Sequence, residues 1–307
     1  MHENDHHDRY DLLVVGSANA DLVIGVERRP AAGETVLGSD LTVHPGGKGG
    51  NQAVAAARLG ARTALLARVG DDAHGRLLLD SQRAAGVDTS GVLVGGAPTG
   101  VALITVDPSG DNSIVVSPGA NGRLTPDDVR EAGPLFEAAR VVSVQLEIPL
   151  DTVAEVAGAM SPGTRLVLNP SPPAPLPDSV LAVCDPLVVN EHEARYILGE
   201  AAGSTAQEWA RALLKSGPRS VVVTLGAQGA LVADSRTGAF VTVPSPEVEA
   251  VDTTGAGDAF TAALAWRLGL GEELTEAAAF AVRVGAAAVT RQGAQASFPT
   301  AEEVSAP

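Results

Sequence analysis

The hydrophobic positions of this chain form short apolar runs that alternate with longer amphipathic stretches over most of its length. Short apolar runs bounded by Gly, Pro, Asn or Asp are typical of buried strands, whereas apolar residues repeated every three or four positions are typical of helices. Strands that alternate with helices predict a parallel sheet covered by helices. Beyond Asn121 we predict helices over 126–139, 150–159, 191–198 and 206–215, strands over 141–146, 166–168, 187–189 and 220–225, two antiparallel strands up to Val243, and closing helices after Gly255 and Glu272.

The residues before Asn121 combine the same units with short extended pieces. An apolar run from Asp11 predicts a first strand, which a polar turn joins to a second strand. The pieces within 22–43 and 98–117 do not fit into strand–helix–strand units, so we expect them to form a small separate sheet. The other elements predicted here are extended residues 35–43, a helix from about 51 to 60, a strand over 64–69, a helix over 73–85, a strand near Val92, and strands over 101–106 and 114–116 that a PSGDN turn joins as a hairpin.

These patterns predict an α/β fold with a doubly wound, mainly parallel central sheet that is covered by helices and accompanied by a small β-sheet. We expect residues 1–9 to be a disordered tail and residues 10–307 to be a single domain. The proline-rich run over 170–177 follows a strand and cannot be helical. It is therefore expected at the rim of the sheet, where ligands of open α/β sheets bind.

Charge and composition limit the classes of partner. The 307 residues include 21 basic and 37 acidic side chains, for a net charge of −16, and such a field repels nucleic acids and anionic membranes. No apolar run is long enough to span a bilayer, and the first residues are charged where a secretory signal would be apolar, so we expect a cytoplasmic protein. The one cysteine, Cys184, has no partner for a disulfide and is expected to be a small buried residue.

The segment VDTTGAGDAF over 251–260 precedes a predicted helix and carries the strongest local signal for chemistry. Gly255 and Gly257 allow a tight turn that presents unpaired N–H groups at the helix N-terminus, where the dipole favours an anion. Asp258 then lies in the first helical turn, and a carboxylate there can accept a proton from a hydroxyl that attacks phosphorus. The alternative is that Asp258 is only a favourable charge at the helix start and Asp252 or Thr253 only a cap.

A second glycine-rich segment, PGGKGGN over 45–51, also opens a helix. Lys48 is one of only two lysines in the chain, but the segment lacks the spacing of a Walker A loop. Its glycines and terminal Asn51 suit close contact with a polyhydroxyl ligand. The alternative is a flexible turn with a helix cap, which would have the same sequence pattern. The GSANAD segment over 16–21 fails the G-x-G-x-x-G pattern, so a dinucleotide-dependent dehydrogenase has little support.

Seven segments together resemble the ribokinase family of carbohydrate and nucleoside kinases over almost the whole chain. They are GSANAD, GGKGGN, QLE at 145–147, NEHE at 190–193, TLGAQG at 224–229, DTTGAGD and AVTRQGAQAS at 288–297, in the family's order and spacing. The resemblance implies an ATP-dependent phosphotransferase that acts directly on an alcohol group, the 5-hydroxyl of D-ribose, giving D-ribose 5-phosphate and ADP. Deoxyribose, another sugar or a nucleoside remain alternative acceptors, and a non-catalytic sugar-sensing relative would not need an intact Asp258.

The resemblance also assigns roles to residues. It implies Asp258 as the catalytic base, with an anion hole at Gly255, Ala256 and Gly257. The implied sugar site is Asn19, Asp21, Gly47, Lys48, Gly49, Gly50, Asn51, Glu147 and Asp258. The implied nucleotide site is Asn190, Glu193, which would organise the water shell of Mg²⁺, Thr224, Leu225, Gly226, Ala227, Gln228, Gly229 and Gly257.

The last implications concern a monovalent cation and the assembly. The family's potassium loop would here use Asp252, Thr254, Ala288, Arg291, Gly293 and Ser297, most of them through backbone oxygens. The segments at about 20–45 and 97–118 would form a lid over the sugar and join two copies as a homodimer. Val282 and Arg283 stand where a polar contact to the nucleotide base is expected, which leaves the nucleotide preference open.

Overall fold

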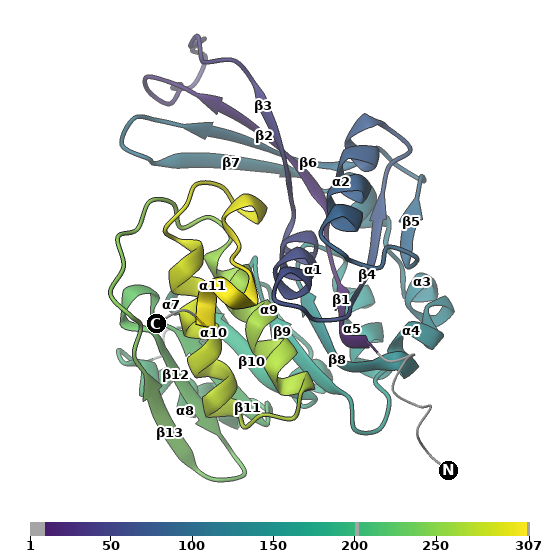
Figure 1. Cartoon of the computed structure of the whole chain (residues 1–307), viewed down its shortest axis with the longest axis vertical. Coiled ribbons are helices and arrows are strands. Elements are labelled where there is room, and N and C mark those ends of the chain that lie inside the picture. The colour runs from purple at the N-terminus through teal and green to yellow at the C-terminus, as the bar shows by residue number, and fades with distance from the viewer. Residues whose placement is uncertain (1–9, 200–202, 306–307) are drawn as a thin grey trace.

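The central feature of the computed structural model, which describes residues 10–199 and 203–305, is a nine-stranded sheet (Figure 1). Its strand order is β13-β12-β11-β10-β9-β8-β1-β4-β5, and the strands from β5 to β11 pair in parallel while β12 and β13 are antiparallel. The predicted doubly wound, mainly parallel sheet is therefore confirmed. The strands are β1 Tyr10–Val15, β4 Thr63–Val69, β5 Val92–Val94, β8 Ala139–Gln145, β9 Arg165–Asn169, β10 Cys184–Asn190, β11 Ser220–Thr224, β12 Ala230–Asp234 and β13 Ala239–Val243.

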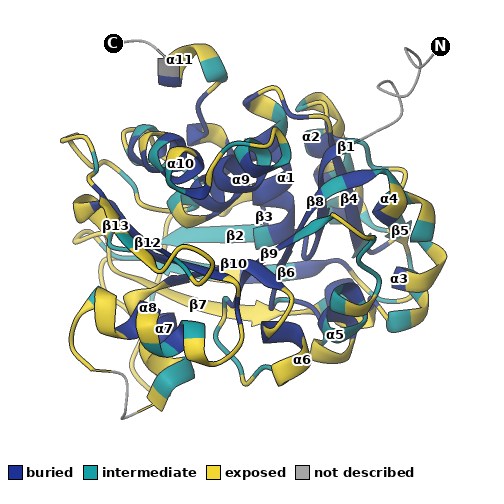
Figure 2. Ribbon diagram, turned by 90° about the horizontal axis from the view of Figure 1, so that it is seen from below, coloured by how far each residue is buried: buried dark blue, intermediate teal, exposed yellow. Residues whose placement is uncertain are grey.

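Helices cover both faces of this sheet, as Figure 2 shows. Successive residues of a strand point to opposite faces, so Leu12 and Val14 pack in one core with α1, α9 and α10, while Leu13 and Val15 pack in the other with α5 and α8. Cys184 is buried in the second core, as expected. The helices are α1 Lys48–Arg58, α2 Ala73–Ala84, α3 Pro126–Glu131, α4 Gly133–Ala138, α5 Leu150–Gly158, α6 Asp178–Leu181, α7 Glu191–Leu198, α8 Ala206–Lys215, α9 Ala256–Gly269, α10 Leu274–Ala288 and α11 Ala301–Ser305.

A second, four-stranded sheet projects from one end of the body (Figure 1). Its order is β3-β2-β6-β7, with β2 and β6 parallel and the other pairs antiparallel. The small separate sheet and the predicted hairpin are thus both present. Its strands are β2 Asn19–Gly25, β3 Thr42–Gly46, β6 Gly100–Val106 and β7 Asn112–Ser117, and we call it the small sheet.

The predicted elements and the observed ones differ at several places. The helix predicted over 126–139 is two helices, α3 and α4, because Pro134 has no N–H to continue the first one. The extended region predicted over 35–43 becomes a regular strand only from Thr42. The short helix α6 was not predicted, since four residues after a proline-rich run give no helical period.

The helix after the first glycine-rich segment begins at Lys48 rather than near Asn51. Gly47 is its N-cap with a φ of 83°, a left-handed conformation that favours glycine. Gly49 lies in the first turn against the β1–β2 connection, where an added Cβ would come within 2.7 Å of the backbone nitrogen of Ser17. These glycines therefore allow α1 to begin in direct contact with the end of β1.

Within residues 10–199 and 203–305, no helix combines the length and the apolar character needed to cross a bilayer.

Candidate active site

The residues singled out in the sequence meet at one edge of the central sheet, where the parallel strands end. Glu147 follows β8, Asn190 ends β10 and Thr224 ends β11. The N-termini of α1 and α9 are brought to the same region, since Asn51 of α1 bonds to Asp258 of α9 although the two are 207 positions apart in the sequence. Ligands of open α/β sheets bind at this carboxyl edge.

The start of α9 has the form of an anion site. Gly255 is the N-cap in a left-handed conformation, with φ 76°, and it makes no side-chain capping bond. An added Cβ at Gly257 would meet no atom within 4 Å, and Ala256 and Gly257 line a cavity. The N–H of Ala256 donates to the carbonyl of Thr253 at 3.3 Å, whereas those of Gly257 and Asp258 donate to no backbone carbonyl of the described residues and can face an anion there.

Asp258 is a buried carboxylate, 6% exposed, in the first turn of α9. The side-chain amide of Asn51 donates to its Oδ2 at 2.9 Å, and that of Gln52 donates to its Oδ1 at 3.3 Å. Burial raises the pKa of Asp258, while Lys48 and the two amides oppose this shift. The arrangement can accept a proton from a bound hydroxyl, which is the chemistry of a general base.

Lys48 and Glu147 lie beside this carboxylate. The backbone N–H of Lys48 donates to Oε2 of Glu147 at 3.0 Å, and the hydroxyl of Ser17 donates to the same oxygen. Burial alone would lower the pKa of the Lys48 ammonium, but the nearby charges of Asp258, Glu147 and Glu193 raise it. Lys48 therefore remains a cation at the centre of the site.

Asn19 and Asp21 occupy the first strand of the small sheet but have different surroundings. Asn19 is buried, and its Oδ1 accepts a bond of 2.7 Å from Asn121. Asp21 lines a cavity of about 750 Å³ between the small sheet and the body. Burial, together with the charges of Glu147 and Asp258, raises the pKa of Asp21 to about 7.

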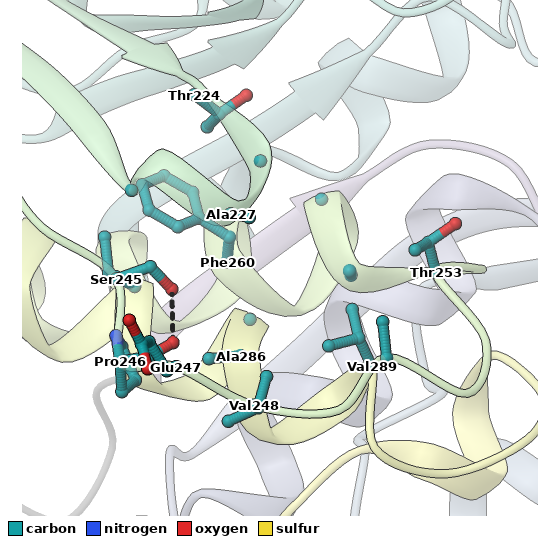
Figure 3. A pocket seen from close by; sticks show the side chains of 17 residues that line it. Thr224, Ala227, Ser245, Pro246, Glu247, Val248, Thr253, Phe260, Ala286 and Val289 are labelled. Atoms are coloured by element: carbon teal, nitrogen blue, oxygen red, sulfur yellow. Dashed lines mark hydrogen bonds between the residues drawn. The ribbon is translucent and has the colours of Figure 1, made fainter.

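A smaller cavity of about 410 Å³ lies on the other side of the α9 N-terminus (Figure 3). Thr224 and residues of the turn after β11 line one wall, and Val282 and Val289 line another. Val282 lines this cavity, whereas Arg283 is exposed with its guanidinium over the ring of Phe280. Among the predicted nucleotide residues this cavity contains Thr224, Gly226, Ala227, Gly229 and Gly257, whereas Leu225, Gln228 and Asn190 line an adjoining cavity of about 300 Å³.

Glu193 is buried at the N-terminus of α7. Its Oε2 accepts the backbone N–H of Asn190 at 2.9 Å, and Asn190 Oδ1 accepts the backbone N–H of Glu193 at 2.8 Å, which is a capping box. No hydrogen bond from the described residues reaches Oε1 of Glu193. That oxygen is available to water, as an organiser of a magnesium hydration shell requires.

Asp252 ties the segment before α9 to the loop after α10. Its two carboxylate oxygens accept backbone N–H groups of Thr254 at 2.9 Å and Gly293 at 2.8 Å. Burial acts to raise the pKa of Asp252, but these bonds outweigh it and hold the pKa below its usual value. The carbonyl oxygens of Ala288, Arg291 and Gly293 accept no backbone hydrogen bond within the described ranges. The loop thus offers hard oxygen atoms that suit a monovalent cation, although Ser297 donates its hydroxyl to the carbonyl of Ala294.

Several polar residues of the site were not predicted to act there. They are Ser17, Gln52, Asn121, Ser143, Gln145 and Gln295. Ser17, Gln145 and Gln295 lie inside segments that carry the family resemblance but were given no role, whereas Gln52, Asn121 and Ser143 lie outside those segments. The 245–250 segment, which lines the smaller cavity, was also missed.

The fold and the buried carboxylate at a helix N-terminus are those of a phosphotransferase of carbohydrates. The model of the pfkB family of carbohydrate kinases matches residues 9–301, and the chain belongs to this family.

Within the family, the chain is similar to kinases of pentose sugars. The chain is 42% identical to a ribokinase of Bacillus subtilis, over 96% of this chain and 98% of the relative, and 34% identical to a deoxyribokinase of Salmonella typhi, over 95% and 97%. It superposes on the Arabidopsis thaliana ribokinase complexed with ribose and ATP with a TM-score of 0.87 and 34% identity, covering 96% of this chain and 97% of that one.

The raised pKa of Asp21 predicts a pH-dependent cost in stability. Because the folded protein binds this proton more tightly than the unfolded chain, its stability falls as the pH rises from about 4 to about 7. Asp21→Asn removes that cost, so we expect the variant to gain stability over the parent only at the higher pH. The gain should be on the order of 2–4 kcal/mol, since one pKa unit is about 1.4 kcal/mol. Urea unfolding at pH 4.5 and pH 8.5 measures it, and an equal difference at both pH values would contradict the assignment.

Proposed function

We propose that this protein is an ATP-dependent ribokinase that transfers the γ-phosphoryl group of ATP to the 5-hydroxyl of D-ribose. The observation that carries the proposal is the place of Asp258. The first turn of α9 contributes Ala256 and Gly257 to the smaller cavity, while Asp21 of the larger cavity is close enough to Asp258 for their charges to interact. A base thus stands between a site for a phosphate donor and a site for an acceptor.

The larger cavity is the proposed sugar site. Its polar groups combine carboxylates, amides and backbone N–H groups, which suits hydroxyls that both donate and accept. Asp21 lines this cavity. We assign Asn19, the 47–51 segment and Glu147 to the same site, because the charges of Glu147 and Asp258 act on Asp21 and Asn51 bonds to Asp258. The Arabidopsis ribokinase whose fold this chain shares binds ribose and ATP, which supports the assignment.

The smaller cavity is the proposed nucleotide site, and ATP, supplied in the cytoplasm, is the proposed donor. Thr224 and Gly226 would lie along the nucleotide, and the open backbone at Gly257 would receive the γ-phosphoryl group. Asn190 and Glu193 would order the water around Mg²⁺. When bound, Mg²⁺ would neutralise part of the negative charge of the phosphates. The protein itself, with a net charge of −16, supplies few cations for this purpose.

The proposed chemistry is direct transfer. Asp258 accepts the proton of the sugar hydroxyl as its oxygen attacks the γ-phosphorus, and ADP leaves on the opposite side. The N–H groups at 255–257 stabilise the negative charge that develops on the phosphoryl oxygens. Lys48, which stays charged, adds positive potential at the same point.

A potassium ion is the proposed activator. The Asp252 carboxylate with the carbonyl oxygens of Ala288, Arg291 and Gly293 would hold it, together with oxygens of Thr254 and Ser297. Asp252 lies only three residues before Gly255, so an ion fixed there would steady the backbone of the anion site and add positive potential beside it.

A homodimer through the small sheet is the proposed assembly. Residues 10–307 would form one domain, in which the segments at about 20–45 and 97–118 form a lid over the sugar. The small sheet exposes apolar side chains that a soluble surface rarely groups together. Leu103, 52% exposed, and Val115, 64%, are cross-strand partners on one face, and Val43, 37%, lies in the same row. Ile114, 52%, and Val116, 43%, lie on the opposite face.

The proposed activity is tested by ADP release from ATP and Mg²⁺ with D-ribose, 2-deoxyribose, fructose and adenosine as acceptors. We expect ribose to be preferred, and Asp258→Asn to lower kcat about 10²–10⁴-fold while still binding ribose, because the substitution removes the base and keeps the shape. Isothermal calorimetry with ribose reports the binding. Turnover of Asp258→Asn near that of the parent would remove the base assignment, and preference for another acceptor would overturn ribose as substrate.

Potassium should stimulate turnover, and Asp252→Asn should weaken this response. Loss of one charged ligand is worth about 1.5–3 kcal/mol, so the potassium concentration for half-activation should rise about ten- to a hundredfold. Potassium titrations at constant ionic strength, with choline chloride as the balancing salt, measure it. Asp178→Asn, at the exposed start of α6, is the matched control, and equal responses in both variants would contradict the site.

The dimer predicts a solution mass twice that of the 31.0 kDa chain at micromolar concentration. Val115→Lys on β7 should yield a monomer, because it places a charge within the apolar face. Light scattering after gel filtration measures both masses. Val94→Lys, an equally apolar change on the exposed edge strand β5, is the control and should stay dimeric, and a monomeric parent would end the proposal.

A further inference from the structure

A buried polar network contacts both carboxylate oxygens of Asp258. Its centre is Gln52, whose side chain is fully buried at 0% exposed in α1. A buried amide in an alanine-rich helix costs free energy unless all its polar atoms are paired. In Gln52 the amide oxygen accepts hydrogen bonds from neutral donors, and the amide nitrogen donates to a carboxylate.

The oxygen of the Gln52 amide accepts two hydrogen bonds from β8. Ser143 donates its hydroxyl at 2.7 Å and Gln145 donates its amide at 2.6 Å. These two residues alternate along the strand and so point to the same face of the sheet. Because the oxygen is held by two donors, the nitrogen must point away from β8.

That direction leads to the catalytic carboxylate. Gln52 Nε2 donates to Asp258 Oδ1, while Asn51 donates to Oδ2. Asn51 is itself oriented by Gln295, whose amide donates to its Oδ1 at 3.1 Å. Each oxygen of Asp258 therefore receives one amide whose orientation is set by a third residue.

A neutral donor suits this position because charges of both signs already face Asp258. Lys48 of α1 attracts the carboxylate, whereas Glu147 after β8 and Asp21 of the small sheet repel it. An amide stabilises the ionised form of the carboxylate by donating a hydrogen bond, adds no net charge, and does not itself ionise over the working pH range. Its geometry also limits rotation of the carboxylate about its last bond.

We propose that Gln52 is a positioning residue that holds Asp258 ionised and aimed at the acceptor, with its own orientation set by Ser143 and Gln145. Gln52 is 0% exposed, and both polar atoms of its amide are bonded to protein groups, so it acts through Asp258 and not by contact with sugar or nucleotide. The role rests on the proposed function of Asp258 as base.

Gln52→Leu is the principal test, since leucine keeps much of the volume and removes both polar ends. Losing a donor to the charged form raises the pKa of Asp258, and the base must be ionised to act. The acidic limb of the kcat profile should therefore move up by about one pH unit, in line with the strength of a hydrogen bond to a charged group. At pH 7 this shift should lower kcat by up to about tenfold, with KM for ribose changed less than about threefold.

Two further variants separate positioning from general damage. Ser143→Ala removes one of the two donors that orient Gln52 and should give a smaller shift in the same direction. Gln82→Leu on α2 is the matched control, because Gln82 is a buried glutamine that donates to the carbonyl of Gly50 at 3.2 Å and does not bond to Asp258. It should lower the melting temperature without moving the acidic limb.

A readout that needs no catalysis keeps this inference distinct from the proposed function. The carboxyl carbon of Asp258, assigned by its loss in Asp258→Asn, is titrated by ¹³C NMR in the free protein of each variant. A higher midpoint in Gln52→Leu supports the positioning role even if no acceptor is phosphorylated, which would end only the kinase proposal. Unchanged midpoints in Gln52→Leu overturn the positioning role, as would equal shifts in Gln82→Leu. Should Gln52→Leu fail to fold, Ser143→Ala decides by the same criterion.

Discussion

The structure depends on keeping a carboxylate charged inside a protein. Asp258 is almost fully buried, and burial alone favours its neutral form. Three kinds of compensation surround it: the positive end of α9, the cation of Lys48, and the amides of Asn51 and Gln52. Lys48, Asn51 and Gln52 all belong to α1, so the site exists only where the starts of α1 and α9 meet.

The doubly wound topology is what brings those groups together. Parallel strands end at one edge, and the helices that follow them begin there, so strand ends and helix N-termini face the same space. Glycine at 47 and 49 then lets α1 start in contact with the end of β1, and Gly255 lets α9 start with free N–H groups. Larger residues at these positions would hold the two helix starts apart.

The sequence predicts the parts of the site that depend on local geometry. Gly255, Gly257 and Asp258 were placed at a helix start by their spacing alone, and alternation of strands and helices predicted the sheet. The resemblance to a kinase family then assigned roles to residues such as Asp21 and Glu147 that local geometry could not supply.

What the sequence did not predict depends on contacts between distant segments. Gln52 and Gln145 are 93 positions apart, and a single polar residue in an apolar run has the same pattern whether it pairs across the core or faces water. The break between α3 and α4 was missed for a local reason. The helical period of apolar residues continues on both sides of Pro134, and we therefore predicted one helix across it. The wall formed by 245–250 has no regular pattern at all.

The charge of the chain gives the site its final constraint. With a net charge of −16, the protein's overall field repels a nucleotide triphosphate, so phosphate must be held by groups within the site. Lys48 is one local cation, and the charges of Asp258, Glu147 and Glu193 raise its pKa. The carboxylates of Asp258 and Glu147 also repel that of Asp21. Backbone N–H groups and neutral amides escape this conflict, because they stabilise anions without adding charge that the neighbouring carboxylates would neutralise. Uncharged donors are therefore used on both sides of the transfer, at the α9 N-terminus toward phosphate and at Asn51 and Gln52 toward the base.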